Sequence, residues 1–77
     1  MDSPILVYVT IASTEEAEKL GRGAVAERLA ACANILPGMR SIYRWQGGIE
    51  TAQEAVLILK TQRSMLDVLT RYVREHH

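Results

Sequence analysis

Two continuous apolar runs predict buried β-strands. Ile5 to Ile11 is rich in β-branched residues, which is typical of a strand that is covered on both faces. Ala55 to Leu59 is also apolar without a break, and we expect it in the middle of a sheet. The two runs therefore outline the centre of a small β-sheet.

The segment between these runs predicts a long β-hairpin. Ala31 to Leu36 and Met39 to Trp45 have extended character, and Pro37-Gly38 separates them where a missing ladder donor favours a bulge or kink. Gln46-Gly47-Gly48 supplies two glycines that can take positive φ, so we expect the chain to turn there. The tip, Arg40 to Glu50, carries charges and the only tryptophan, and we expect it to project beyond the core.

A first amphipathic helix is predicted after the first strand. Ser13 and Glu16 fit a capping box, in which the hydroxyl accepts from the amide of Glu16 and the carboxylate reaches back to the amide of Ser13. The apolar stripe comprises Ala17, Leu20, Ala24, Val25 and Leu29. Gly21 and Gly23 each cost this helix up to ~1 kcal/mol relative to alanine. Close packing against a sheet is one reason to keep them.

A second helix is predicted after the hairpin, with Thr61 or Ser64 as its N-cap. Its apolar stripe comprises Met65, Leu66, Leu69, Tyr72 and Val73. The order β-α-β-β-α, in a single domain over residues 1–77, matches an α+β sandwich of the ferredoxin-like type, β-α-β-β-α(-β), without its last strand. In the complete plan that strand lies beside the first, so here Ile5 to Ile11 would be an unpaired apolar edge. We therefore expect the 77 residues to be part of a longer chain, incomplete at the C-terminus.

Size and composition favour self-association. A fold of this length buries only about 60% of the surface of its unfolded chain, and so small a core rarely supplies more than ~3–5 kcal/mol. One cysteine excludes an internal disulfide, which leaves a metal or oligomerisation as the source of extra stability. The 48% hydrophobic content favours oligomerisation, because so many apolar side chains need cover.

Charge and targeting signals narrow the class of protein. Nine basic and nine acidic side chains cancel, and no run of like charge could neutralise several phosphates, which disfavours a nucleic-acid partner. The longest apolar run is too short to span a bilayer, and no basic segment precedes it, so we expect neither a membrane span nor a signal peptide. A cytoplasmic protein is expected, in which the thiol stays reduced.

Four separated blocks of the sequence resemble the CutA divalent-cation tolerance family. They are Glu27 to Ile35, Pro37-Gly38, Ser41 to Gly47 and Leu57 to Thr61, in the family's order and spacing over nearly the whole chain. The resemblance implies a ferredoxin-like fold like that of the PII signalling proteins. It also implies a tight homotrimer in which the hairpins pack against neighbouring subunits, a link to tolerance of copper and other divalent metals, and no enzymatic activity.

The resemblance further implies a ligand site in the clefts between subunits. Carried over position by position, it gives Cys32 and His77 as metal ligands. It gives Asn34, Trp45 and Lys60 as residues that bind the ligand. This chain ends at His76-His77, where the family continues into a Pro-Tyr segment, a further strand and a terminal helix.

The residues alone leave the role of Cys32 open. In an extended strand Cys32 and Asn34 share one face. A free cysteine is usually a small buried hydrophobe, whereas a soft thiolate is what Cu(I) selects, and Met39 is a second soft donor in the same strand. One chain offers too few ligands, so copies from several subunits, or a fold that brings His77 near Cys32, would have to complete a metal site. A nucleophilic role is disfavoured, because no internal histidine is available as a base.

The other candidates also have structural explanations. His76 and His77 can interact with the C-terminal dipole of the second helix or belong to an expression tag. Trp45 can stack on a planar ligand or anchor a subunit contact. Lys60 can neutralise an anionic ligand or be a solvated strand end.

The sequence thus predicts a trimeric, non-enzymatic binder of copper or another divalent cation that acts in the response to metal ions. Two alternatives stay open. The first is a PII-like signalling module that binds a small anionic metabolite or nucleotide between subunits, and the lack of a Gly-rich anion loop counts against it. The second is a structural trimer that presents a surface to a protein partner.

Overall fold

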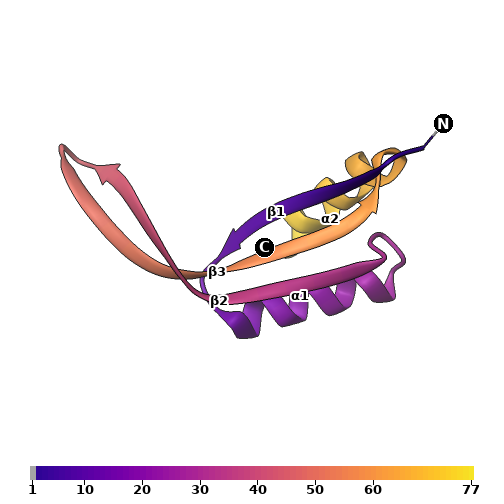
Figure 1. The fold of residues 1–77 in the computed structure, drawn as a ribbon, viewed down its shortest axis with the longest axis horizontal. Helices are drawn as coiled ribbons and strands as arrows, with labels where there is room; N and C mark the ends of the chain where they lie inside the picture. Colours follow the sequence, from indigo (N-terminus) through magenta and orange to yellow (C-terminus); the bar gives the residue numbers. More distant parts are fainter. Residues whose placement is uncertain (1) are drawn as a thin grey trace.

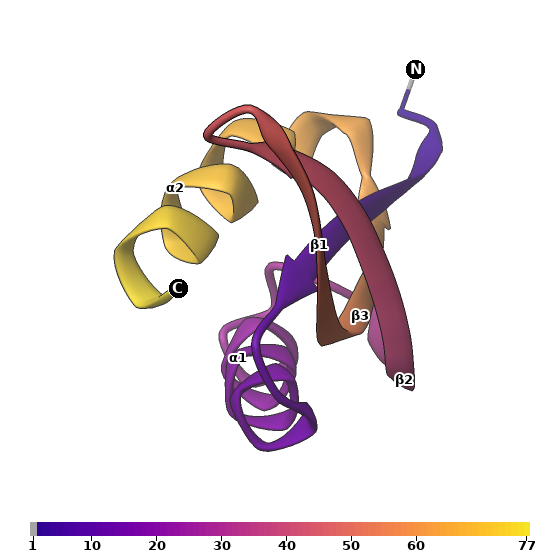
Figure 2. The same cartoon turned by 90° about the vertical axis from the view of Figure 1, so that its left-hand side faces the viewer.

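The computed structural model describes residues 2–77, which form a three-stranded antiparallel sheet with both α-helices against the same face (Figures 1 and 2). The elements are β1 Pro4–Ile11, α1 Thr14–Ala26, β2 Cys32–Trp45, β3 Gly48–Gln62, the 3-10 helix η1 Arg63–Met65 and α2 Leu66–His76. This confirms the predicted order, and the strand order across the sheet is β1-β3-β2. Among the described residues, neither α-helix has the length and apolar character needed to cross a membrane.

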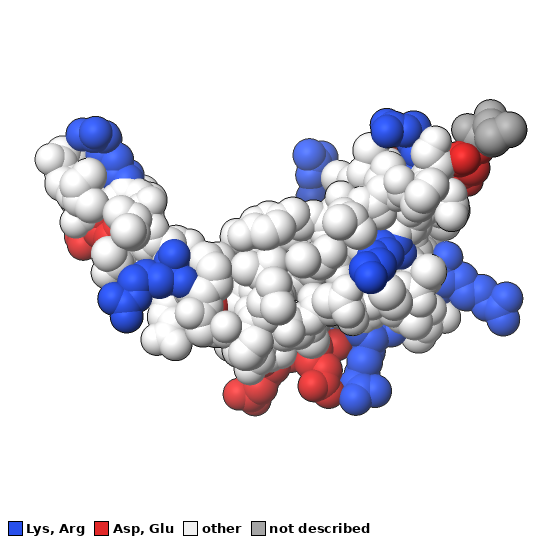
Figure 3. Space-filling view, in the orientation of Figure 1, with Lys and Arg blue, Asp and Glu red and all other residues white. Residues whose placement is uncertain are grey.

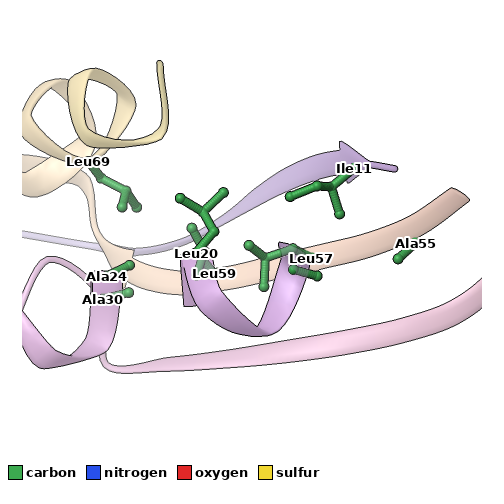
Figure 4. Close-up of a cluster of buried hydrophobic side chains, with 9 residues drawn as sticks. Ile11, Leu20, Ala24, Ala30, Ala55, Leu57, Leu59 and Leu69 are labelled. Atoms are coloured by element: carbon green, nitrogen blue, oxygen red, sulfur yellow. The ribbon is translucent and has the colours of Figure 1, made fainter. Parts of the chain in front are cut away.

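The core lies between the helices and β3, the central strand. Leu57 and Leu59 of β3 are fully buried, and they pack with Leu20 and Ala24 of α1 and Leu69 of α2 (Figure 4). The prediction that Ala55 to Leu59 lies in the middle of the sheet is therefore confirmed.

The prediction that β1 is covered on both faces is wrong for this chain. Burial alternates along the strand: Val7 and Val9 pack against the core, whereas Leu6 and Tyr8 on the other face are 66% and 64% exposed. The continuous apolar run therefore reflects one buried face and one uncovered apolar face. Within residues 2–77, β1 pairs only with β3, so it is an edge strand as predicted.

A β-bulge at Pro37-Gly38 divides the hairpin, as predicted. Leu36 pairs with Val56 and Met39 with Glu54, so two residues stand opposite Ala55. Gly38 has a φ of 72°, which glycine adopts without steric cost. Beyond the bulge the hairpin leaves the core and projects as an arm (Figure 1), which confirms the expectation for the tip.

The hairpin turn differs from its prediction in one residue. Gln46 and Gly47 take positive φ, at 48° and 79°, and Gly48 already begins β3. Positive φ at both central residues of a two-residue loop is the geometry of a type I′ turn, whose twist matches the flanking strands. The two residues of positive φ are therefore Gln46 and Gly47, whereas the second glycine of the predicted turn, Gly48, belongs to β3.

Helix α1 begins as predicted and ends earlier. The amide of Glu16 donates to the Ser13 hydroxyl at 3.1 Å, but the Glu16 carboxylate accepts from that same hydroxyl at 3.3 Å and not from the amide of Ser13. Arg28 has a φ of 61°, and the amide of Leu29 donates to the carbonyl of Ala24 at 2.9 Å. This left-handed residue closes the helix, so Leu29 lies outside it.

The predicted cap of the second helix is wrong. The Thr61 hydroxyl donates to the carbonyl of Leu29 at 2.7 Å, and α2 has no side-chain cap. Ser64, in η1, donates through both its hydroxyl and its amide to the carboxylate of Asp2. The start of the helical segment is therefore capped by a residue from the other end of the chain, which no local sequence pattern could show.

The contact between Asp2 and Ser64 predicts a pH-dependent contribution to stability. Hydrogen bonds from the Ser64 side chain, and then from its amide, lower the pKa of Asp2 below its ordinary value of 3.8. A lowered folded-state pKa means that the stabilisation is present above that ordinary value and is lost as the pH falls through the folded-state pKa. Asp2→Asn should thus lower the melting temperature at neutral pH, and the difference from the parent protein should shrink in acid. Calorimetry across the pH range checks this, and a difference that persists unchanged in strong acid would contradict it.

Candidate functional site

Three of the five predicted site residues lie together on the sheet face that the helices leave uncovered. Cys32 pairs with Lys60, which also pairs with Leu6, and Asn34 pairs with Ile58. Directly paired residues point to the same side of a sheet, with Cβ atoms about 4.5–5.5 Å apart. The predicted shared face of Cys32 and Asn34 is therefore confirmed, and the strand register adds Lys60 to it.

This uncovered surface, here called the open face, is largely apolar. Its exposed and half-buried side chains are Leu6, Tyr8, Cys32, Asn34, Leu36, Ile58 and Lys60, whereas Val56, which has the same register, is buried. Leu6, Tyr8 and Leu36 are each more than half exposed, at 66%, 64% and 52%. Apolar side chains gathered in this way mark an interaction surface more often than an ordinary solvent-facing one.

Cys32 is half-buried at the beginning of β2, beside a groove between α1 and β2. The groove has a volume of about 600 Å³, and Gly21, Val25 and Ala33 also line it. Met39, the second soft donor, lies seven residues along the same strand, which is about 23 Å at 3.3 Å per residue. Its sulfur accepts from the Ser41 hydroxyl at 3.3 Å, so within one chain Met39 is not a partner for Cys32.

Trp45 lies at the tip of the hairpin, far from Cys32. Thirteen residue steps separate them along β2, which is about 43 Å of strand. Trp45 is 59% exposed, and Ile42, Tyr43 and Ile49 beside it are exposed as well. The tip is thus a second apolar surface, and one chain does not bring Trp45 to the open face.

His77 is also separated from Cys32. Its Nε2 atom is 3.0 Å from the carbonyl oxygen of Thr10. Thr10 lies four residues along β1 from Leu6, and Leu6 lies in the same cross-strand row as Lys60 and Cys32. That is about 13 Å along the strand, and Cys32 lies two strand spacings of about 4.8 Å to the side. Of the two ways to complete a metal site, the fold of a single chain therefore does not bring His77 to Cys32, which leaves copies from several subunits. Within residues 2–77, no three His, Cys, Asp or Glu side chains form a group that could hold a metal ion.

A cleft between α1 and α2 escaped the sequence analysis. It has a volume of about 530 Å³, and Glu16, Lys19, Tyr72, His76 and His77 are among its lining residues. The rings of Tyr72 and His76 stack in it, with centroids 4.0 Å apart and planes inclined by 22°. Their spacing of four residues on one helix is the signal that could have indicated this pair.

The charged side chains form no continuous basic patch on the face that Figure 3 shows. Lysine and arginine side chains stand apart there, with acidic side chains between some of them. This face therefore agrees with the sequence, which has no run of like charge.

Comparison with known proteins places this geometry in a family. A family model described as CutA1 divalent ion tolerance protein matches residues 5–77, which is nearly the whole chain. The chain belongs to the CutA1 family. The predicted resemblance is therefore confirmed.

Individual relatives agree with this assignment. The protein CutA 1, chloroplastic, of Oryza sativa is 45% identical over 73 residues, which cover 95% of this chain and 41% of the relative. The crystal structure of CutA1 from Oryza sativa superposes with a TM-score of 0.92 at 44% identity, over 96% of this chain and 68% of that one. CutA1 from Ehrlichia chaffeensis gives 0.95 at 30% identity, over 100% and 72%. The predicted fold, with its long β2-β3 hairpin, is thus that of the CutA1 structures.

The CutA1 comparisons also bear on coverage, activity and location. The chain spans about 40% of the length of the plant relatives that it matches. The family model and the relative from Thermus thermophilus are described by divalent ion tolerance and divalent-cation tolerance. Two relatives are chloroplastic by name, so family membership does not set the compartment, and a cytoplasmic location stays a prediction.

Proposed function

We propose that the protein acts in the tolerance of divalent cations as a homotrimer that binds copper or another divalent metal between its subunits. The observation that carries this proposal is the open face, where Cys32, Asn34 and Lys60 lie among exposed apolar side chains. A thiolate suits Cu(I), and burial of the face by another subunit would exclude water from it.

Copies of the same chain are the partners that this surface favours. The open face lies on the core part of the sheet, and the hairpin tip lies at the far end of the arm, in a molecule 45 Å long (Figure 1). The projecting arm can therefore reach the core of a neighbouring subunit. Trp45 and His77, which one chain holds apart from Cys32, can join its site only from another subunit, and symmetric copies also multiply the single thiol.

One observation favours a second function. Lys60 pairs directly with Cys32, and Asn34 pairs with Ile58, which lies two residues from Lys60 on β3. A cation and an amide therefore lie side by side on the open face. These groups suit a small anionic metabolite or nucleotide bound between subunits, as in a signalling module. Lys60→Gln separates the two functions, because it removes the charge for an anion and leaves the thiol for a metal.

The metal proposal predicts a specific loss on removal of the thiol. Replacement of a residue that only orients a metal ligand typically lowers the metal affinity about tenfold or more, and loss of the ligand itself should lower it at least as much. Cys32→Ala should therefore weaken Cu(I) binding at least about tenfold. The measurement is an anaerobic competition titration with a chromogenic Cu(I) chelator, and Met39→Leu, which removes the other soft donor of the strand, serves as the matched control. Sedimentation equilibrium on the same samples should give three times the chain mass of 8.6 kDa.

Each part of the proposal can fail separately. A monomer mass contradicts the trimer and, with it, a site between subunits. Equal Cu(I) affinities of the parent protein and Cys32→Ala contradict the thiol as a ligand. Binding of a nucleotide that is abolished by Lys60→Gln and unaffected by Cys32→Ala would favour the signalling function instead.

A further inference from the structure

We infer that the cleft between α1 and α2 is a binding site for a small organic cation, an alkylammonium ion that consists of a primary ammonium group and a short apolar chain. The site lies within one subunit, on the side of the sheet that the helices cover, so it is separate from the open face and does not depend on assembly. The polar groups of the cleft determine the charge of the ligand, and the apolar wall determines the rest of it.

The cleft has the size and lining of a small-molecule site. Its volume is about 530 Å³, within the range of about 300–1,000 Å³ that is typical of ligand pockets. Ile11 and Leu20 give it an apolar wall. A few polar side chains converge on the same space, namely Glu16 and Lys19 from α1 and Tyr72, His76 and His77 from α2. An apolar wall with a few polar groups favours an amphipathic ligand.

The neutral imidazoles leave hydrogen-bond acceptors at the cleft. Nδ1 of His76 lies 2.8 Å from the carbonyl oxygen of Tyr72, and Nε2 of His77 lies 3.0 Å from that of Thr10. A carbonyl oxygen only accepts, so in each neutral ring the nitrogen that faces it carries the proton. His76 Nε2 and His77 Nδ1 therefore carry lone pairs, which can accept from a ligand.

The Glu16 carboxylate adds negative charge to these acceptors. It accepts from the Ser13 hydroxyl at 3.3 Å, and a carboxylate has about four lone-pair sites, so most of its capacity remains for a ligand. His76 and His77 also lie at the C-terminal end of α2, where the helix dipole is negative. A ligand with positive charge and several N–H donors fits this environment. An ammonium group has three such donors and no acceptor.

His76 is ordered before any ligand binds. Its ring stacks on Tyr72 at a centroid distance of 4.0 Å, which restricts the orientation of the imidazole. A group that is already ordered loses less conformational entropy on binding.

Lys19 works against a cationic ligand, because its ammonium also lines the cleft. The same side chain lines a second hollow on α1, together with Glu15, Glu18 and Arg22. The long side chain of Lys19 can therefore turn its ammonium toward Glu15, four residues earlier on the helix, which is the spacing of an ion pair. Lys19 thus lowers the affinity for a cation without filling the site.

The test is a titration with n-pentylammonium at pH 8, where an imidazole is uncharged, followed by NMR of the backbone amides. We expect shifts at the residues that line the cleft, and weaker binding of 1-pentanol and pentanoate, which have the same chain without the positive charge. Glu16→Gln should weaken binding of the cation about twofold to fivefold, the effect of one charge pair in a partly exposed site. Lys19→Gln should strengthen it by a similar factor.

Two further variants sharpen the test. Glu18→Gln removes the same charge from α1 outside the cleft, so this matched control should bind as the parent protein does. His76→Phe keeps an aromatic ring beside Tyr72 and removes the acceptor nitrogen, so it should weaken binding.

The opposite signs of the Glu16 and Lys19 effects identify the charge of the ligand. Pentanoate that binds as tightly as pentylammonium would overturn the inference, as would two effects of the same sign or shifts confined to residues outside the cleft. Circular dichroism of each variant establishes that the fold is intact. The Cu(I) titration of Cys32→Ala is a separate measurement, so neither result decides the other.

Discussion

The Leu59→Ala variant is expected to lose about 2–5 kcal/mol of unfolding free energy, the range for a buried leucine that is truncated without full relaxation of its surroundings. Leu59 is fully buried in the central strand, where it pairs with Val7 of β1 and Ala33 of β2. A core of this size rarely supplies more than ~3–5 kcal/mol. The loss is therefore comparable to the whole stability of one subunit, and we expect the variant to be largely unfolded.

Circular dichroism without denaturant shows whether Leu59→Ala is unfolded, and urea unfolding measures any stability that remains. Leu6→Ala is the matched control, because it deletes the same atoms from the open face, where Leu6 is 66% exposed. In an isolated subunit its effect should stay within about 0.5 kcal/mol, as for other surface substitutions. In a trimer that covers the open face, the effect of Leu6→Ala should grow with protein concentration. Equal losses for the two variants at low concentration would place the core elsewhere.

The elements that depend on local pattern were predictable from the sequence. The apolar run of β3, the bulge at Pro37-Gly38 and the cap at Ser13 each follow from a few neighbouring residues, and the structure has all three. The exposed side of β1 was not predictable in this way. Leu6 and Tyr8 are as apolar as a buried face requires, although no element among residues 2–77 covers them.

The features that depend on distant contacts were missed. Ser64 has the local signature of an N-cap but donates to Asp2, a residue 62 positions away. In the site, the alternation of a strand predicted that Cys32 and Asn34 share a face, whereas the pairing of Cys32 with Lys60 depends on strand register. The separation of His77 from Cys32 depends on where α2 docks, which no sequence pattern encodes.

The two glycines of α1 have different structural reasons, and only one is the predicted packing against the sheet. A Cβ at Gly21 would lie 3.0 Å from the Cβ of Ala33 and 3.3 Å from Leu57 Cδ1, so Gly21 lets the helix approach the strands closely. A Cβ at Gly23 would overlap the hydroxyl of Tyr72 and lie 3.1 Å from its Cζ atom. Gly23 therefore provides space for the contact between the helices.

The Gly23→Ala variant should be destabilised because its methyl group displaces Tyr72 from this contact. Overpacking of this kind costs about 1–3 kcal/mol, and the higher helix propensity of alanine offsets up to about 1 kcal/mol of it. Tyr72→Phe removes the hydroxyl that the methyl group meets. In that background Gly23→Ala should therefore cost less, or even stabilise the protein through helix propensity alone.

Urea unfolding of the parent, the two single variants and the double variant gives the coupling between the positions. We expect the double variant to be more stable than the sum of the single effects predicts. Gly21→Ala is the control: its methyl group meets Ala33 and Leu57 and not Tyr72, so its cost should be the same with tyrosine or phenylalanine at position 72. If Gly23→Ala also costs the same in both backgrounds, Tyr72 does not set the requirement for glycine, and the position of α2 against α1 needs another explanation.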